Sequence, residues 1–264
     1  MYPFQLHTAS SGSNASTMIS GKDDAKYLAG GQSLIAAMKL RLNAPTDLVD
    51  LSQASDLKGI RSDGKTVTIG AMTTHAEVAS SADVMKAIPA LASLAGAIGD
   101  RQIRNVGTIG GALANNDPAA DYPAGVLALN ATIHTSKRTI AADQYFTGMY
   151  ETALEPGELM TAVSFPIPKK AAYIKFKNPA SRFALIGVMV AQTGDGARVA
   201  VTGGGSGVFR VAEMEKALSS NWSAAAIANV KVASSGLSSD LHGSAEYRAH
   251  LVGVLAQRAV SAAG

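Results

Sequence analysis

Residues 104–117 read RNVGTIGGALANND and place three glycines within five positions, at Gly107, Gly110 and Gly111. Glycine allows tight backbone turns and lets another group approach the chain closely. No lysine follows these glycines, in contrast to the GxxxxGK[ST] loop, which holds nucleotide phosphates with a lysine side chain. If this segment binds an anion, backbone N–H groups must therefore donate the hydrogen bonds.

A second glycine turn occurs earlier in the chain, where residues 29–34 read AGGQSL. The composition predicts a short strand at residues 27–31 that enters the turn, and a helix at residues 32–41 that ends before Pro45. The N–H groups of the turn, with the helix N-terminus behind them, can surround an anion without a basic side chain. The alternative is a tight turn that needs a positive φ at Gly30 or Gly31, and it stays open.

Two such turns suit a ligand with two phosphates, such as a dinucleotide, because each turn can donate to one side of a diphosphate. Asp121, which ends the DPAAD segment, could accept hydrogen bonds from sugar hydroxyls or from a ring nitrogen. Its alternative role is the N-cap of a helix predicted at residues 122–129.

The composition excludes several classes of protein. Of 264 residues, 47% are hydrophobic and 16% charged, as in an ordinary globular chain, and the net charge of +3 disfavours a nucleic-acid surface. The chain has no cysteine, so it cannot hold an iron–sulfur cluster through cysteine. The five histidines lie in no metal or nucleophile motif, and His75 and His134 are interpreted as surface or capping residues. We predict no catalytic residue, no metal ligand, no transmembrane segment and a cytoplasmic location.

The order of the predicted elements indicates an α+β fold, because strands and helices alternate in the first two thirds and strands precede helices in the last third. Pro166 and Pro168 end a predicted strand and mark a domain boundary. Residues 10–20 are expected to form a poor helix. Residues 202–207, TGGGSG, are interpreted as a flexible connection and not as a nucleotide loop. Further strands are predicted at residues 47–51, 66–70, 131–135, 159–165, 172–177, 185–192 and 198–202, and helices at 75–80, 88–99, 213–218 and 245–260.

Several segments taken together closely resemble the FAD-binding medium subunit of molybdenum hydroxylases, the group that includes xanthine dehydrogenase and carbon monoxide dehydrogenase. They are AGGQSLIAAMKLRL at 29–42, TIGAMTTHAEV at 68–78, IGDRQIRNVGTIGGALANNDPAADYPA at 98–124 and NPASRFALIGVMVA at 178–191. The resemblance implies a two-subdomain FAD-binding domain of the PCMH type at residues 1–168, with subdomains at about 1–54 and 55–168. It also implies a C-terminal domain at residues 169–264 with a three-stranded antiparallel sheet and helices.

The resemblance further implies which residues contact FAD. The pyrophosphate would lie between AGGQSL and TIGG, Asp121 would contact the cofactor, and Lys177 would lie near the flavin. On this basis, a Cβ at Gly110 or Gly111 is expected to fill space that the pyrophosphate needs. The implied cofactor-binding residues are Ala29, Gly30, Gly31, Gln32, Ser33, Leu34, Ile98, Thr108, Ile109, Gly110, Gly111, Asn115, Asp121, Met160 and Lys177.

The function implied by the resemblance is electron transfer through FAD. Electrons would come from [2Fe–2S] clusters on a small partner subunit, after oxidation of a substrate at a molybdenum cofactor on a large partner subunit, and would pass to an external acceptor. The implied assembly is a dimer of heterotrimers. Two alternatives stay open: a self-contained flavin reductase or oxidase, and a non-enzymatic nucleotide-binding assembly module.

Overall fold

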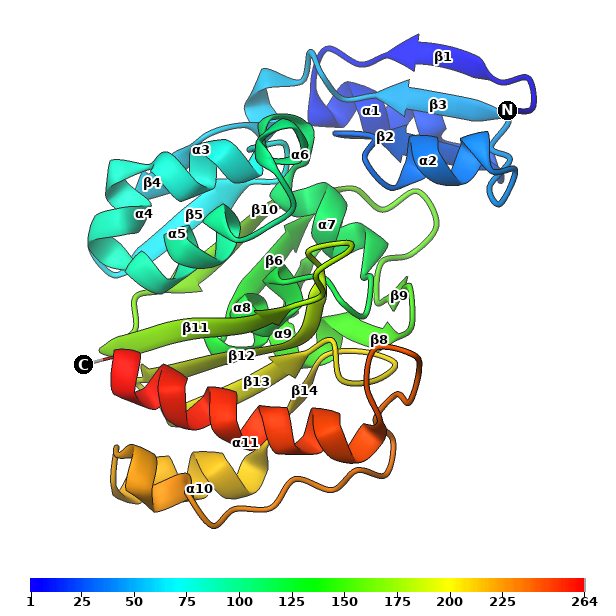
Figure 1. Ribbon diagram of the computed structural model, residues 1–264. Helices are drawn as coiled ribbons and strands as arrows, with labels where there is room; N and C mark the ends of the chain where they lie inside the picture. Colours follow the sequence, from blue (N-terminus) through cyan, green and yellow to red (C-terminus); the bar gives the residue numbers. More distant parts are fainter. Residues whose placement is uncertain (264) are drawn as a thin grey trace.

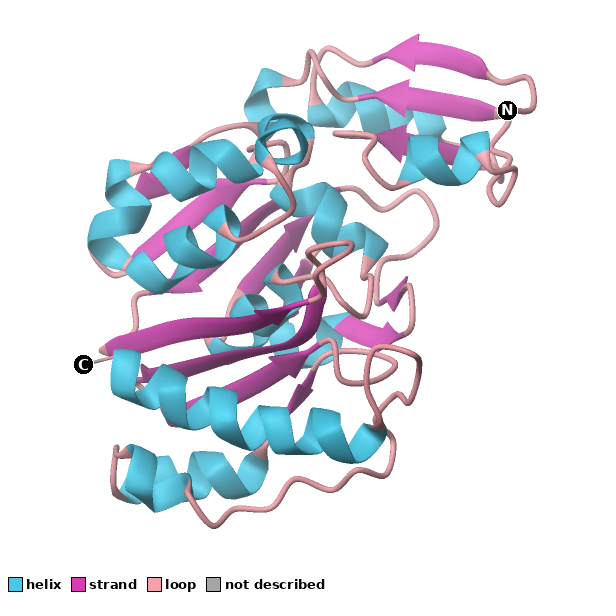
Figure 2. Ribbon diagram, viewed as in Figure 1, coloured by secondary structure: helices cyan, strands magenta, loops and turns pink. Residues whose placement is uncertain are grey.

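The structure, a computed structural model, describes residues 1–263 and is built on a three-stranded, a five-stranded and a four-stranded sheet (Figures 1 and 2). No helix among these residues has both the length and the hydrophobicity needed to cross a membrane. The mixture of parallel, antiparallel and helical elements confirms the predicted α+β fold.

The N-terminal part forms a small parallel sheet with strand order β1-β3-β2, uppermost in Figure 1. Residues 10–20, expected to be a poor helix, do form α1, because the Ser11 side chain accepts the N–H of Asn14 and Ala15 and Ile19 are buried. The elements are β1 (Gln5–Thr8), α1 (Gly12–Ile19), β2 (Ala25–Leu28), α2 (Leu34–Lys39) and β3 (Asp47–Asp50).

The middle part is an antiparallel sheet with strand order β4-β5-β10-β6-β7 and a group of short helices. Strand β10 lies between β5 and β6, so the chain leaves this sheet after β7 and returns to its centre. The strands are β4 (Ile60–Ser62), β5 (Thr66–Gly70), β6 (Thr132–Thr135), β7 (Thr139–Ala141) and β10 (Met160–Pro166). The helices are α3 (His75–Ser80), α4 (Ala82–Ala87), α5 (Pro89–Gly96), α6 (Arg101–Val106), α7 (Ile109–Asn115), α8 (Tyr122–Ala128) and α9 (Ala142–Tyr145). The 3-10 turn Ser55–Leu57 precedes β4, and the hairpin of β8 (Phe146–Gly148) and β9 (Glu151–Thr152) follows α9.

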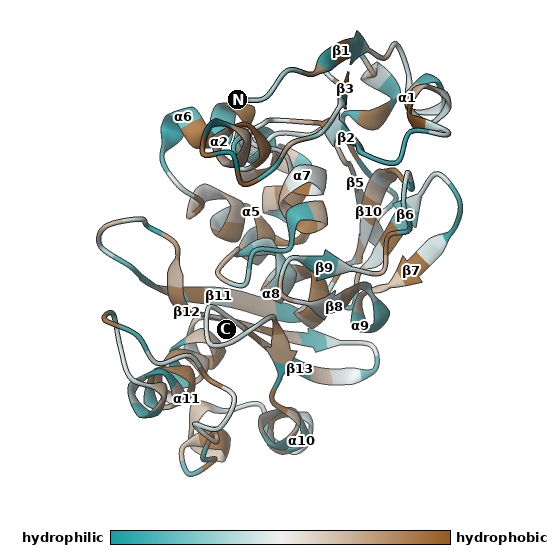
Figure 3. Ribbon diagram, turned by 90° about the vertical axis from the view of Figure 1, so that its right-hand side faces the viewer, coloured by the Kyte–Doolittle hydropathy of each residue, from teal (hydrophilic) through white to brown (hydrophobic). Residues whose placement is uncertain are grey.

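The C-terminal part is an antiparallel sheet covered by helices on both faces, α10 and α11 on one side and α5 and α8 on the other. This double cover explains why β12 reads as a nearly continuous hydrophobic run, and Figure 3 shows hydrophobic residues along β12 and β13. The sheet has three long strands, as predicted, and a fourth of two residues. The elements are β11 (Lys170–Lys177), β12 (Ala184–Thr193), β13 (Gly196–Thr202), β14 (Phe209–Arg210), α10 (Ala212–Ser220), the 3-10 turn Ala224–Ile227 and α11 (Ala245–Ala262).

The C-terminal sheet shares its core with the middle part of the chain. Tyr173, Met189 and Ala200 are buried in the same hydrophobic cluster as Phe165 and Leu94. The opposite face of the sheet packs in a second cluster with α10 and α11. The division into residues 1–168 and 169–264 stays a prediction, and Gly264 lies outside the described residues.

Candidate functional site

The two glycine turns of the sequence lie against each other in the fold. A Cβ placed on Gly30 would lie 2.2 Å from the carbonyl oxygen of Val106 and 2.8 Å from the Cα of Gly107. A Cβ on Gly111 would lie 3.5 Å from the Cβ of Ala29. The glycines therefore permit a close approach between two loops that are far apart in the sequence.

The first turn, residues 29–34, offers unpaired backbone donors. Within residues 1–263, none of its N–H groups donates a hydrogen bond to the protein. Gly31 has φ of +70°, so the positive-φ interpretation of this turn is also correct. Ser33 is exposed and its side chain makes no capping bond, although it occupies the N-cap position of α2. Because α2 has only six residues, the unpaired N–H groups, and not a long helix dipole, make this turn suitable for an anion.

The second turn, residues 108–111, has three of its four backbone donors in use. The N–H of Ile109 donates to the carbonyl of Thr73 at 3.1 Å, and that of Gly110 donates to the carbonyl of Ala71 at 2.9 Å. The N–H of Gly111 donates to Oγ1 of Thr108, which caps α7. Three of the four N–H groups on this side of the expected amide cradle therefore already have partners, whereas that of Thr108 donates no hydrogen bond within residues 1–263, so the role of this turn in binding the pyrophosphate stays a prediction.

The role of Gly110 also differs from the one expected. A Cβ on Gly110 would lie 2.6 Å from the Cβ of Ala71 and 2.7 Å from its carbonyl oxygen. The side chain of a larger residue would meet the neighbouring backbone and not a ligand space. Gly110 is thus required for the packing of α7 on the segment after β5.

His75 is bonded to the backbone immediately before the second turn. Its backbone N–H donates to the carbonyl of Gly107 at 2.9 Å, and its ring lies 5.3 Å from the ring of Tyr122. Burial lowers the pKa of His75 to about 4, with a smaller contribution from the positive charge of Arg104. The interpretation of His75 as a surface or capping residue is therefore wrong, since the imidazole is buried and neutral at pH 7.

Asp121 lies in a buried polar cluster. Its Oδ1 accepts a hydrogen bond from the hydroxyl of Tyr173 at 2.5 Å, and its Oδ2 forms an ion pair with Nζ of Lys175 at 2.8 Å. Asp121 occupies the N-cap position of α8, as the alternative interpretation expected, but its side chain makes no capping bond with that helix. Burial raises the pKa of Asp121, and Lys175 and then Tyr173 oppose that rise.

Residues at the end of β13 in the C-terminal sheet also form hydrogen bonds with the backbone just before Asp121. Oγ1 of Thr202 donates to the carbonyl of Ala120 at 2.6 Å or to that of Pro118 at 3.0 Å, and the N–H of Gly203 donates to Pro118 at 2.9 Å. The carbonyl of Gly204 in turn accepts the N–H of Ser238. The expectation that residues 202–207 form a flexible connection is therefore wrong for Thr202, Gly203 and Gly204, which are fixed by hydrogen bonds.

The remaining predicted residues have varied environments. Ile98 is half-buried, and its carbonyl accepts a hydrogen bond from Arg104 at 2.9 Å. Met160 is buried in the core at 4% exposure, which leaves little of its surface for a ligand. Asn115 is half-buried at the end of α7, whereas Lys177 is exposed at the end of β11.

Sequence reasoning missed Tyr173 and Lys175, which lie on the same face of β11 as Lys177. The sequence did contain an indication of both residues. Side chains in a strand alternate between its two faces, so residues 173, 175 and 177 share one face. A buried aspartate also needs donors, and this strand supplies them.

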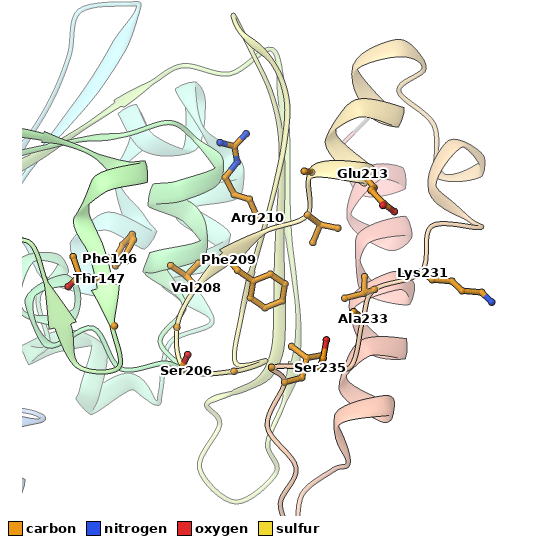
Figure 4. Close-up of a pocket in the computed structure, with 18 residues that line it drawn as sticks. Phe146, Thr147, Ser206, Val208, Phe209, Arg210, Glu213, Lys231, Ala233 and Ser235 are labelled. Carbon is orange, nitrogen blue, oxygen red and sulfur yellow. The ribbon is translucent and has the colours of Figure 1, made fainter.

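A separate cavity of about 620 Å³ lies between β8, the segment around β14 and residues 231–237 (Figure 4). In Figure 4, Phe209 points between β14 and the segment that carries Ala233 and Ser235. None of the residues predicted to bind FAD lines this cavity. The candidate site therefore rests on the glycine turns and the Asp121 cluster.

Two family models cover almost the whole chain. The FAD binding domain in molybdopterin dehydrogenase matches residues 2–168. The CO dehydrogenase flavoprotein C-terminal domain matches residues 171–263.

Individual relatives agree with these matches. The carbon monoxide dehydrogenase medium chain of Hydrogenophaga pseudoflava is 36% identical over 91% of this chain and 89% of its own length. The nicotine 6-hydroxylase medium subunit of Paenarthrobacter nicotinovorans is 36% identical over 95% of this chain and 94% of its own length. A chain in the structure of reconstituted CO dehydrogenase from Oligotropha carboxidovorans superposes with a TM-score of 0.90 at 36% identity, covering 100% of this chain and 99% of that one. The chain therefore belongs to the FAD-binding medium subunits of the molybdenum hydroxylase family, and it is an oxidoreductase subunit.

Proposed function

We propose that this chain is the FAD-carrying electron-transfer subunit of a heteromeric molybdenum hydroxylase. It takes electrons from [2Fe–2S] clusters on a small partner subunit and passes them to an external acceptor. The substrate is oxidised at a molybdopterin cofactor on a large partner subunit. The relatives named as medium chains support the existence of such partners, and the absence of cysteine supports clusters that lie on another chain.

The observation that carries the proposal is the set of unpaired N–H groups in residues 29–34, next to the second glycine turn. A diphosphate needs several donors at one place, and this turn presents them on an accessible loop. The missing side chain of Gly30 lets this turn lie against the backbone of Val106 and Gly107, beside the second turn. The residues present thus fit the diphosphate part of FAD.

The chain's own residues would bind and orient the cofactor, and bound FAD would supply the redox chemistry. The turn at residues 29–34 donates hydrogen bonds to the diphosphate, with Gln32 and Ser33 presenting exposed polar side chains beside it. The second turn acts chiefly as a support, because three of its four N–H groups are paired within the protein. Ile98, Asn115, Asp121, Met160 and Lys177 stay proposed contacts further along the cofactor.

The proposal is tested by reducing the flavin through its partners. The complex is purified from the native host through a tag on this chain, and absorbance near 450 nm is followed without oxygen after a substrate of the complex is added. We expect rapid bleaching in the complex and none in the separated chain with the same substrate. Bleaching of the separated chain at the same rate would overturn the electron-transfer role.

The self-contained flavin reductase is separated from this proposal by a second reductant. Rapid reduction of the isolated, FAD-loaded chain by NAD(P)H, followed by turnover of a small substrate, would support that alternative. Assembly as a dimer of heterotrimers and a cytoplasmic location are part of the proposal, and light scattering and cell fractionation test them.

A further inference from the structure

We propose that Lys175 is a positioning residue of the FAD site, which ties Asp121 to the loop that carries Ile98. This inference rests on the proposed FAD site, since both Asp121 and Ile98 are proposed contacts. Lys175 belongs to β11, in the C-terminal part of the chain, whereas the two groups that it joins belong to the preceding part.

The first half of the tie is the ion pair with Asp121. Nζ of Lys175 lies 2.8 Å from Oδ2 of Asp121, and the two side chains are only 3% and 4% exposed. The hydroxyl of Tyr173, two residues earlier on the same strand, occupies Oδ1. Because each carboxylate oxygen has its own donor from β11, the plane of the carboxylate is fixed.

The second half of the tie is a backbone carbonyl. Nζ of Lys175 also donates to the carbonyl oxygen of Ala97 at 3.3 Å. The next two carbonyls, of Ile98 and Gly99, accept from the guanidinium of Arg104 at 2.9 and 3.2 Å. Three successive carbonyls are therefore bound by two cationic side chains, so the backbone on both sides of Ile98 is held.

Strand β12 provides the space that this arrangement needs. A Cβ on Gly187 would lie 2.2 Å from the hydroxyl oxygen of Tyr173 and 2.9 Å from Cγ2 of Thr202. Gly187 is the residue paired with Lys175 across β11 and β12. Any larger residue at position 187 would push the Tyr173 hydroxyl away from Asp121.

A buried lysine with these partners does more than add an ion pair to the core. Burying two charges costs free energy that their attraction only partly offsets, so stability alone is a weak reason for such a pair. The geometry instead sets the relative positions of two loops that approach the cofactor from different elements. Removing the ammonium leaves Asp121 buried without its ion-pair partner, so it should lower stability as well as FAD affinity, and affinity must be compared in folded protein.

The experiment compares FAD binding and stability in variants of the tagged chain purified with its partners. Lys175→Met removes the ammonium and keeps the length of the side chain, and Lys175→Arg keeps a cation. Lys170→Met is the matched control, since Lys170 starts the same strand and makes no ion pair or side-chain hydrogen bond within residues 1–263. The readouts are the dissociation constant of FAD, the shape of the flavin absorption band near 450 nm and the melting temperature.

We expect Lys175→Met to raise the dissociation constant about tenfold or more, the loss typical of a buried hydrogen bond to a charged group. The flavin band should change shape, Lys175→Arg should recover most of the affinity, and Lys170→Met should match the wild type. The affinities are compared at a temperature at which circular dichroism shows each variant folded.

Wild-type affinity and an unchanged flavin band in folded Lys175→Met would overturn the inference. If that variant does not fold, Lys175→Gln replaces it, since it also removes the ammonium and keeps a hydrogen-bond donor, and wild-type FAD affinity and flavin band in that variant would again overturn the inference. A wild-type complex that holds no FAD on this chain would instead overturn the proposed function, so the two failures are distinguishable.

Discussion

The two glycine turns look alike in sequence, yet they differ in what their backbone does. The turn at residues 29–34 leaves its N–H groups unpaired, whereas the turn at residues 108–111 gives three of them to Thr73, Ala71 and Thr108. The first turn is thus free to bind a ligand, and the second is committed to the fold. A glycine motif shows that a backbone comes close to something, and only the hydrogen-bond partners show to what.

Gly110→Ala should have the largest effect on the stability of the folded chain. The new Cβ would meet Ala71 at 2.6 Å, so α7 must move away from the segment behind it. We expect a loss of about 3 kcal/mol, near the upper end for overpacking a close contact. Thermal and urea unfolding followed by circular dichroism measure this loss.

Gly253→Ala is the matched control, because a Cβ on Gly253 in α11 would meet nothing within 4 Å. This exchange should leave stability unchanged or raise it by up to about 1 kcal/mol through helix propensity. Equal melting temperatures for Gly110→Ala and the control would contradict the structural role of the second turn.

Acid should lower the free energy of unfolding through the protonation of His75, which is bonded to the backbone beside the second turn. The pKa of His75 in the folded chain, about 4, lies below the ordinary histidine pKa of 6.5, so the unfolded chain binds a proton that the folded chain excludes. Stability is therefore fully present above pH 6.5, falls as the pH drops toward 4 and is constant below that with respect to this group. The loss contributed by His75 is about 3 kcal/mol at pH 4.

The measurement is the slope of unfolding free energy against pH between 6.5 and 4 in wild type and in His75→Gln. We expect the variant to have the flatter slope. His134→Gln is the comparison, since burial also lowers the pKa of His134, but its half-buried ring bonds to Ser164 in the five-stranded sheet and not to the turn. Equal slopes in wild type and His75→Gln would rule out this account.

Thr108→Ala should have a smaller effect, because it removes one capping bond from α7. A lost N-cap typically costs about 1 kcal/mol, and each such loss lowers the melting temperature of a chain of this size by about 2–4 °C. Differential scanning calorimetry resolves a shift of that size. No shift would mean that the hydroxyl does not hold Gly111 in solution.

Ser33→Ala should have the smallest effect on stability, within about 0.5 kcal/mol, because the hydroxyl makes no capping bond. It should instead raise the dissociation constant of FAD about tenfold, the effect of losing a hydrogen bond from this exposed hydroxyl to a charged phosphate oxygen. Isothermal titration measures the affinity, with Ser13→Ala as the control, since Ser13 is an exposed residue of α1. If Ser33→Ala lowered the stability of the chain but not its affinity for FAD, the turn at residues 29–34 would have a structural role, and its assignment as the binding turn would be contradicted.

Much of the fold follows from local pattern. Strand β5 and helix α3 have the predicted bounds, since TVTIG alternates between faces and Thr74 forms a capping box with Glu77. Helices α6 and α7 were not predicted as helices, because they are short and α7 contains two glycines that disfavour helix. Burial of Ile109, Gly110 and Leu113 compensates for that propensity in α7, whereas α6 buries no residue and is held by the Asp100 side chain, which accepts the N–H of Ile103.

The candidate site was predictable only where residues adjacent in sequence form one loop. The turn at residues 29–34 is such a loop, and its sequence alone indicated an anion site. The pairing of the second turn was not predictable, because the acceptors Thr73 and Ala71 come from another segment. Lys175 was missed for the same reason: a strand pattern gives the face of a residue and not the group opposite it.

The hydrogen bonds that the carbonyls of Pro118 and Ala120 accept determine when, during synthesis, the segment beside Asp121 can fold. Their donors, Thr202 and Gly203, emerge from the ribosome long after the glycine turns, and the carbonyl of Gly203 is itself held by Arg248 of α11. The backbone beside Asp121 therefore cannot reach its final arrangement until the last helix has been made. A nascent or truncated chain that ends before α11 should accordingly be unable to retain flavin, so cofactor loading follows completion of the polypeptide.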